Sequence, residues 1–275
     1  MFKIYDLNMK EIPFPDGVIP LEIFVGSVGK ERTVDTVDGR PGVVDYGFNY
    51  TDRPVALFLR IKATDAADFR LLRNEVFATF DVGSAFYVAE ADVPSRVLKV
   101  VVDESYIPDR LTEEYADFDI NCRTLDSVFW ESIYTTKELH DSGYSATAEK
   151  YGLVDNIDDE KVKYRFTENT FTVYNAGNVT VEPESMYLEL LFYYCTIPDG
   201  KMTVKNLTTG DVLEINSVEN RMHIKQSGMK LTIGAVQRFR DTNRRFISLA
   251  PGDNQFEITG ATFDEARFDF KYYFK

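Results

Sequence analysis

The amino-acid sequence predicts an α+β N-terminal domain, a β-sheet with one main helix, followed by an all-β sandwich. The first part of the chain combines several β-type runs with a single amphipathic helix. From about residue 171, strand-like runs recur at intervals of about ten residues with turns between them. With 275 residues and 44% apolar content, the chain can bury two cores. We place the domains at 1–135 and 171–275, with an acidic linker or excursion at 136–170.

The N-terminal domain begins with a strand-like run at residues 18–28 that leads into a long polar stretch. This stretch contains DGRPG at residues 38–42, where glycine permits positive φ and proline holds φ at about −65°. We therefore expect a long surface loop or arm here. The next run, Pro54–Ile61, is almost continuously apolar and has the length of a buried strand.

The clearest helix spans Asp65–Phe80. Asp65 is a suitable N-cap, and Asp68 completes a variant of the capping box, with both carboxylates near the positive end of the helix dipole. One arc of the helix collects the side chains that should pack on the sheet: Phe69, Leu72, Val76, Phe77 and Phe80. Leu71 points nearly the opposite way, so it is either an ordinary exposed leucine or part of a subunit contact.

Three further β-type runs follow the helix, at residues 85–91, 96–106 and 117–124. An acidic loop between the last two carries the apolar pair Tyr106 and Ile107. Apolar side chains where the local pattern predicts exposure are candidates for contacts between subunits. We therefore predict that Leu71, Tyr106 and Ile107 lie in an oligomer interface.

The C-terminal part carries two hairpin signals. LTTGD at residues 207–211 and QSGM at residues 226–229 each separate two strand-like runs. In the final run the aromatic residues alternate with mostly charged ones, which predicts a half-buried strand at the end of the chain: Phe268, Phe270, Tyr272 and Phe274.

The composition excludes several classes of protein. Thirty-one Lys and Arg residues stand against 45 Asp and Glu residues, a net charge of −14, which argues against wrapping nucleic acid because that requires clustered cations. Cys122 and Cys195 lack the spacing of a metal or redox pair and should be buried free thiols. The N-terminus lacks the pattern of a signal peptide, and no run reaches the roughly 18 apolar residues of a membrane span. We therefore expect synthesis in the cytoplasm.

Catalytic signals are sparse. The two histidines are His140, expected in a solvated loop, and His223, expected in a strand, and neither belongs to a triad or metal motif. The run DNIDDE at residues 155–160 has the composition of a calcium loop but not its spacing. The glycine in the middle of such a loop and the bidentate glutamate at its end are both missing. A glycoside hydrolase would need two carboxylates about 5 to 9 Å apart in a cleft, and nothing points to one. We expect no catalytic residues, no metal and no cofactor.

The order and spacing of these segments resemble the distal tail proteins of long-tailed bacteriophages, and prophages, of Gram-positive bacteria. No segment is specific alone, but together they span nearly the whole chain: DGRPG at 38–42, LLRNEVFATF at 71–80, RVLKVVV at 96–102, DFDINCRTLDSVFWES at 117–132, NAGNVTVEP at 175–183, NLTTGD at 206–211 and LAPGDNQFEITG at 249–260. The acidic segment 136–170 is longer than in the shorter members, which leaves open whether a receptor-binding protein docks directly on the sandwich.

This resemblance implies a structural protein of the virion tail tip and not an enzyme. In the family, the N-terminal domain forms a homohexameric ring, single or as two stacked rings, and the C-terminal domain is a galectin-like sandwich. The implied partners are the tail tube protein, the tail-associated lysin and a receptor-binding protein, with no membrane. DNA passes through the lumen without specific binding, which the acidic balance suits.

The alternative is a prophage-derived carbohydrate-binding or adhesin module. Its ligand-binding residues are not identified by the sequence. The predicted sandwich has no tryptophan and one histidine, so Tyr193 and Tyr194 would have to take the place of the stacking residue of sugar-binding galectins.

Overall fold

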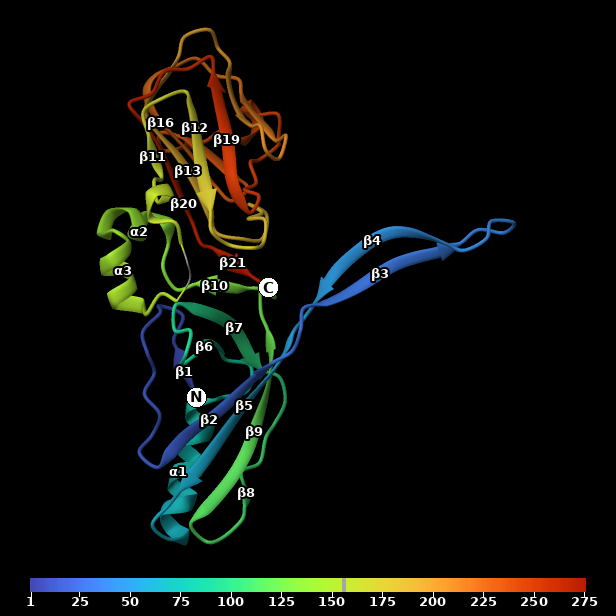
Figure 1. The fold of residues 1–275 in the computed structure, drawn as a ribbon, viewed down its shortest axis with the longest axis vertical. Helices are drawn as coiled ribbons and strands as arrows, with labels where there is room; N and C mark the ends of the chain where they lie inside the picture. Colours follow the sequence, from blue (N-terminus) through green and yellow to red (C-terminus); the bar gives the residue numbers. More distant parts are fainter. Residues whose placement is uncertain (155–156) are drawn as a thin grey trace. The chain divides into compact units, whose positions relative to one another are not determined.

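β-Strands are the main elements of the chain in a computed structural model that describes residues 1–154 and 157–275 (Figure 1). The chain divides into two compact units, Met1–Trp130 with Lys275, and Glu131–Phe274. Each unit buries a core of its own, with Leu57 and Val76 fully buried in the first and Leu190 and Phe268 buried in the second. Among the described residues, no helix is both long and apolar enough to cross a membrane.

The first unit is built on an antiparallel sheet in the strand order β1-β6-β7-β9-β5-β2. Its strands are β1 (Phe2–Tyr5), β2 (Val18–Val25), β5 (Pro54–Lys62), β6 (Ala85–Glu90), β7 (Arg96–Val102) and β9 (Tyr115–Thr124), and the short β8 (Asp109–Arg110) pairs with β9. The strand expected at 54–61 is confirmed as β5, but the expectation that it is buried was wrong. β5 buries Leu57 and Leu59 but leaves Phe58 37% exposed, because only one face of this strand is covered.

The helix α1 (Ala66–Thr79) lies where the sequence predicts it. The Asp65 carboxylate caps it by accepting hydrogen bonds from the backbone N–H groups of Ala67 and Asp68, both at 2.8 Å. The Asp68 carboxylate reaches back to the N–H of Thr64 at 2.8 Å, one residue before the cap. The predicted apolar face is buried except for Phe77, which is 39% exposed at the edge of the arc.

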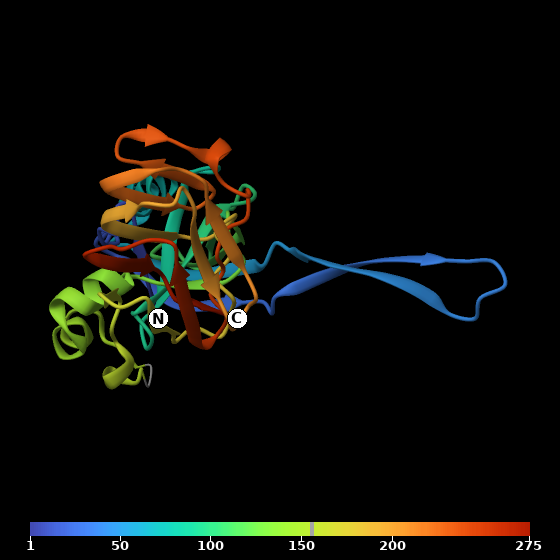
Figure 2. The same ribbon diagram turned by 90° about the horizontal axis from the view of Figure 1, so that it is seen from above.

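The arm expected around residues 38–42 is a β-hairpin. Its strands β3 (Gly29–Thr36) and β4 (Val43–Thr51) pair with each other in a sheet of their own, and the loop between them spans residues 37–42. Gly39 and Gly42 have φ of 80° and 91°, a region that favours glycine, which is why the DGRPG sequence can turn here. The hairpin extends away from the sheet of the first unit (Figures 1 and 2).

The second unit contains two antiparallel sheets. The six-stranded sheet has the order β11-β20-β13-β16-β17-β18, with β11 (Arg165–Phe166), β13 (Leu188–Ile197), β16 (Glu219–Ser227), β17 (Lys230–Ile233), β18 (Val236–Gln237) and β20 (Glu265–Phe270). The four-stranded sheet has the order β12-β19-β14-β15, with β12 (Thr170–Asn175), β14 (Met202–Asn206), β15 (Val212–Ile215) and β19 (Gly252–Thr259). A short 3₁₀ turn, η2 (Phe239–Asp241), follows β18. Both predicted hairpins are confirmed, as β14–β15 and β16–β17.

Aromatic side chains join the two sheets. Phe268 on β20 packs against Phe256 on β19 and Phe171 on β12, with ring centroids 4.9 and 5.7 Å apart. Phe171 also stacks on Phe166 of β11 at 4.2 Å. Because these rings belong to both sheets and are at most 9% exposed, they form the core between the facing sheets.

The segment expected to be an acidic linker or excursion, 136–170, contains two helices, α2 (Thr136–Ser142) and α3 (Tyr144–Tyr151), and the 3₁₀ turn η1 (Asp159–Lys161). Thr136 ties α2 to β20, since its hydroxyl accepts from the N–H of Phe270 at 2.9 Å and donates to the carbonyl of Phe268. The segment also includes Asp155 and Asn156, which lie outside the described residues, so the structure does not describe the full DNIDDE run.

The final strand is shorter than predicted. β20 ends at Phe270, and a separate short strand, β21 (Tyr273–Phe274), pairs with β10 (Trp130–Ser132). Tyr273 is 2% exposed although the alternation placed it on the exposed side. Phe268, Phe270, Tyr272 and Phe274 are all buried, as predicted. Tyr273 departs from the alternation because the chain leaves the six-stranded sheet after Phe270.

Candidate functional site

The three residues predicted to form an oligomer interface differ in their surroundings. Leu71 on α1 is 63% exposed and Ile107 is 83% exposed, as the local pattern predicts. Tyr106 is half-buried: its ring stacks on Phe118 at 6.1 Å and meets the edge of Phe77 at 5.6 Å. The expectation that Tyr106 is exposed was therefore wrong, because its loop folds back over the end of α1.

The Tyr106 hydroxyl supports the C-terminal end of α1. It donates to the backbone carbonyls of Val76 and Phe80, at 3.2 and 3.0 Å. The Val76 carbonyl also accepts from the N–H of Phe80 at 2.9 Å, so the contact chiefly satisfies the Phe80 carbonyl, one of the last carbonyls of the helix. Burial raises the pKa of Tyr106 well above its ordinary value. Tyr106 therefore stabilises the first unit itself, whatever part it has in assembly.

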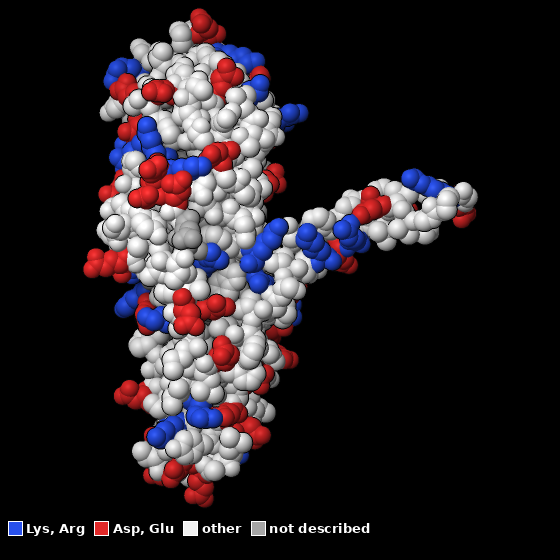
Figure 3. Space-filling model, viewed as in Figure 1, with Lys and Arg blue, Asp and Glu red and all other residues white. Residues whose placement is uncertain are grey.

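The sequence analysis missed a surface of the first unit on which exposed apolar side chains are concentrated. On the hairpin formed by β3 and β4, six apolar side chains are 41% to 65% exposed: Val34, Val37, Val43, Tyr46, Phe48 and Tyr50. Uncharged residues cover much of the visible hairpin surface, interrupted by a few charged ones (Figure 3). An isolated two-stranded hairpin is marginally stable in water, and its outer edges leave backbone groups unpaired.

Side-chain contacts stiffen the base of the hairpin. Phe48 and Tyr50 pack edge to face at 5.4 Å, and the ammonium group of Lys30 lies 4.1 Å from the centre of the Phe48 ring. Tyr50 in turn meets Phe129 of the first unit at 5.0 Å. The base is thus anchored, while the residues from Val34 to Val43 have no such aromatic contact among those described.

Beside the base of the hairpin, the sheet also exposes apolar side chains. Phe24 on β2 is 57% exposed and packs edge to face on Phe58 of β5 at 5.2 Å. A groove of about 350 Å³ adjoins them, lined by Phe24, Pro54, Ala56, Asn121 and Arg123 among others. β2 pairs only with β5, so its other edge is open.

The cysteines and histidines were the other candidates for chemistry in the sequence. Cys122 and Cys195 are free and buried, as predicted, and burial raises the pKa of both thiols to about 12. His140 lies on α2 and not in a loop, whereas His223 lies on a strand, β16, as expected. Among the described residues, no three His, Cys, Asp or Glu side chains come together as they would around a metal ion.

Comparison with known proteins agrees with this picture of an assembly protein. Residues 7–122 match the family described as the phage tail protein RIFT-related domain. This part of the chain is similar to a phage tail domain. The tail domain covers β2 to most of β9 and includes the whole hairpin. No curated protein matches the sequence.

Solved structures extend the likeness beyond the tail domain. The Dit protein (gp 19.1) of phage SPP1, described as a paradigm of the hub adsorption apparatus in phages that infect Gram-positive bacteria, has 12% sequence identity, a TM-score of 0.67 and 99% coverage of both chains. A chain in the activated baseplate of phage P2 with calcium has 11% identity and a TM-score of 0.43, over 98% of this chain and 97% of its own. The SPP1 protein shares the fold.

The tail-domain match and this shared fold confirm the resemblance to siphophage distal tail proteins. They support a structural role in a phage tail or baseplate and not an enzymatic one.

Proposed function

We propose that this protein is the distal tail protein at the tail tip of a long-tailed phage or prophage of a Gram-positive bacterium, and that six copies form a ring. In this proposal residues 1–135 build the ring. Residues 171–275 form a galectin-like sandwich that holds or positions receptor-binding parts, and the segment 136–170 connects the two.

The observation that carries the proposal is the exposed hairpin. Its strands β3 and β4 pair with no other strand that the structure describes, and its apolar side chains remain in contact with water in a single subunit. A neighbour that packs on the hairpin would bury these side chains and pair its open edges. If each copy contacts the next copy in the same head-to-tail way, the contacts close into a ring.

The tail domain also offers a surface that can receive such an arm. The groove beside Phe24 is lined by apolar residues, among them Pro54 and Ala56, and by the ion pair of Arg123 with Asp103. The hairpin carries Arg32 and Asp45 as an ion pair between its apolar residues, so both surfaces combine apolar area with paired charge. Complementarity of this kind favours a contact between two copies of this chain.

The neighbours of the ring follow from its proposed place. We place it between the tail tube protein and the tail-associated lysin, with a receptor-binding protein attached, and DNA passing through the lumen during infection. The net charge of −14 suits a channel that does not retain DNA. A strongly basic lumen in an assembled ring would contradict this part of the proposal.

The mass of the purified protein tests the ring. Size-exclusion chromatography with light scattering should give about 190 kDa, six times the 31.5 kDa of one chain, or twice that value for two stacked rings. Tyr46→Asp on the hairpin should shift the mass toward one chain. Val236→Asp, which changes a similarly exposed apolar residue on β18, is the matched control and should leave the ring intact.

A chain that remains monomeric both alone and with its tail tube protein and lysin would contradict the proposal. So would equal ring formation by the wild-type protein and the Tyr46→Asp variant.

A further inference from the structure

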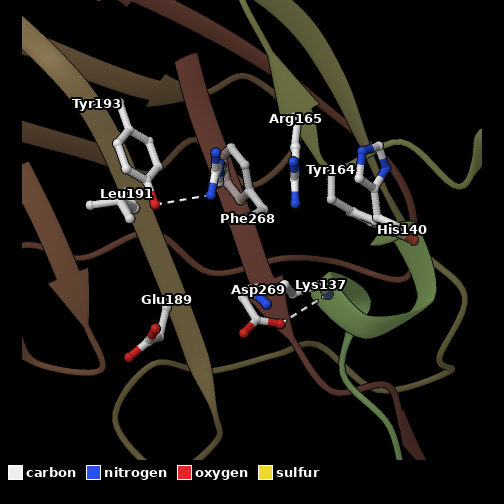
Figure 4. Close-up of a pocket in the computed structure, with 10 residues that line it drawn as sticks. Lys137, His140, Tyr164, Arg165, Glu189, Leu191, Tyr193, Phe268 and Asp269 are labelled. Atoms are coloured by element: carbon white, nitrogen blue, oxygen red, sulfur yellow. Dashed lines mark hydrogen bonds between the residues drawn. The ribbon is translucent and has the colours of Figure 1, made fainter. Parts of the chain in front are cut away.

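A small cavity opens on the outer face of the six-stranded sheet of the second unit (Figure 4). Its volume is about 130 Å³. Leu191 of β13 supplies apolar lining on this face, and Glu189, Tyr193 and Asp269 lie around it on β13 and β20. Phe268 also borders the cavity, although its ring packs in the core between the two sheets. The helix α2 closes one side with Lys137 and His140.

The positively charged groups at the cavity are held in place by other side chains of the protein. The Arg267 guanidinium lies 4.2 Å from the centre of the Tyr193 ring, donates to the Tyr193 hydroxyl at 3.0 Å and pairs with Glu265. Arg165 pairs with Asp141 on α2. Because these guanidinium groups are already ordered, a ligand that bonds to them has little side-chain entropy to remove.

The carboxylates at the cavity are held in the same way. Glu189 accepts from Lys225 at 2.7 Å and from Ser227 at 2.9 Å. Asp269 accepts from the N–H of Lys137 at 3.0 Å and from the Tyr187 hydroxyl at 2.8 Å. Each carboxylate can accept about four hydrogen bonds, so both retain free acceptor positions.

The charges in and around the cavity balance. Four cations face four acids: Lys137, Arg165, Lys225 and Arg267 against Asp141, Glu189, Glu265 and Asp269. In a chain with a net charge of −14, this patch is locally neutral. A cavity without net charge gives no advantage to an anion or a cation, and it favours a neutral ligand that both donates and accepts hydrogen bonds.

The size and lining indicate what that ligand is. An apolar cavity of about 150 Å³ holds one benzene ring, so this cavity has room for about one six-membered ring. Its apolar lining suits a ring face made of C–H groups, and its guanidinium and carboxylate groups suit hydroxyls at the ring edge. We propose that the cavity binds one ring of a neutral saccharide.

A row of aromatic rings continues from the cavity. A β-bulge in β13 breaks the register between Phe192 and Cys195, and Tyr194 adopts φ of 49°, which is unusual for a bulky residue. The His223 ring lies between the rings of Tyr193 and Tyr194, at 5.0 and 4.8 Å. Backbone strain of this kind is concentrated at functional sites. We place a second sugar residue along this row.

Binding of the intact protein to a glycan array tests the assignment, with saturation-transfer NMR on the methyl glycosides of glucose, galactose and N-acetylglucosamine. Neutral saccharides should bind, and charged ones should bind more weakly. Leu191→Arg, which fills the cavity from an outward-facing position, should weaken binding at least tenfold. Gln255→Arg, on the outer face of the four-stranded sheet, is the control and should not change it.

Two further variants separate binding from folding. Glu189→Gln keeps the shape of the side chain and should weaken binding several-fold while the far-ultraviolet circular dichroism stays unchanged. Tyr194→Ala should weaken binding of a disaccharide but not of a methyl glycoside.

Absence of any saccharide signal, or equal binding by Leu191→Arg and the wild-type protein, would overturn the assignment. Loss of assembly with tail proteins in Leu191→Arg, without any saccharide binding, would instead identify the cavity as a protein-docking site. Neither result bears on ring formation, which the mass measurement tests separately.

Discussion

Tyr106 offers a sharp test of how the tail domain is stabilised. Tyr106→Phe removes the hydroxyl that bonds to the carbonyls of Val76 and Phe80 but keeps the ring stacked on Phe118. The Val76 carbonyl keeps a second partner, the N–H of Phe80 at 2.9 Å. Only the Phe80 carbonyl then loses its hydrogen bond from Tyr106 without a second partner of this kind. We therefore expect Tyr106→Phe to lower the free energy of unfolding by about 1 to 2 kcal/mol.

Removal of the whole ring should cost more. A fully buried aromatic residue costs about 3 to 5 kcal/mol when replaced by alanine, and because Tyr106 is only half-buried we expect about 2 to 3 kcal/mol for Tyr106→Ala. Ile107→Ala is the matched control, since its side chain is 83% exposed, and it should change stability by less than about 0.5 kcal/mol.

Urea unfolding followed by tryptophan fluorescence measures these changes. The single tryptophan, Trp130, is 8% exposed and ends the first unit, so its emission reports on that unit. Equal stability of Tyr106→Phe and the wild-type protein would refute the helix-end role. If the stabilities are equal, a loss of assembly in Tyr106→Asp would indicate that Tyr106 lies in a subunit interface and would not be explained by partial unfolding.

Three other predictions concern stability. Phe268→Ala should cost the second unit about 3 to 5 kcal/mol, because Phe268 joins both sheets, and calorimetry should show a lower melting transition for that unit alone. Asp65→Ala should cost about 1 kcal/mol through loss of the α1 cap, whereas Asp65→Asn should retain most of that stability in the same urea assay. The raised pKa of Tyr106 means that the folded state favours the neutral phenol. The contribution of this phenol to the free energy of unfolding is complete below its ordinary pKa of 10.0 and declines as the pH rises above that value. The urea midpoint should therefore fall between about pH 9 and pH 11, and it should fall less in Tyr106→Phe.

The elements that could be predicted from sequence are those whose signal is local. The α1 helix has a cap at Asp65 and an apolar face of period 3.6, and both can be read within sixteen residues. The hairpins around LTTGD and QSGM follow from turn residues between short strand runs. In these cases the residues that determine the structure are close together in the sequence.

Other elements depend on distant residues. β3 and β4 expose both faces, so they lack the alternation that marks a half-buried strand. The helices α2 and α3 are seven and eight residues long and bury few residues, and α2 is held by the contact of Thr136 with β20, more than a hundred positions away. Short helices of this kind depend on tertiary contacts, which the local sequence does not reveal.

The candidate sites follow the same division. The exposure of Leu71 and Ile107 could be predicted from their places in a helix and a loop, whereas the burial of Tyr106 depends on its reaching the end of α1. The cavity of the second unit draws on α2, β11, β13 and β20, so no local motif indicates it. Its charges balance only when these elements and Lys225 of β16 are brought together.

Hydrogen exchange of the hairpin amides, measured on the assembled protein and on dilute single subunits, tests the central claim most directly. If the hairpin is the arm that joins neighbouring copies, amides of β3 and β4 that exchange rapidly in the single subunit should become protected in the ring, while those of β12 and β19 stay unchanged. Equally rapid exchange of the hairpin amides in both states would contradict the account.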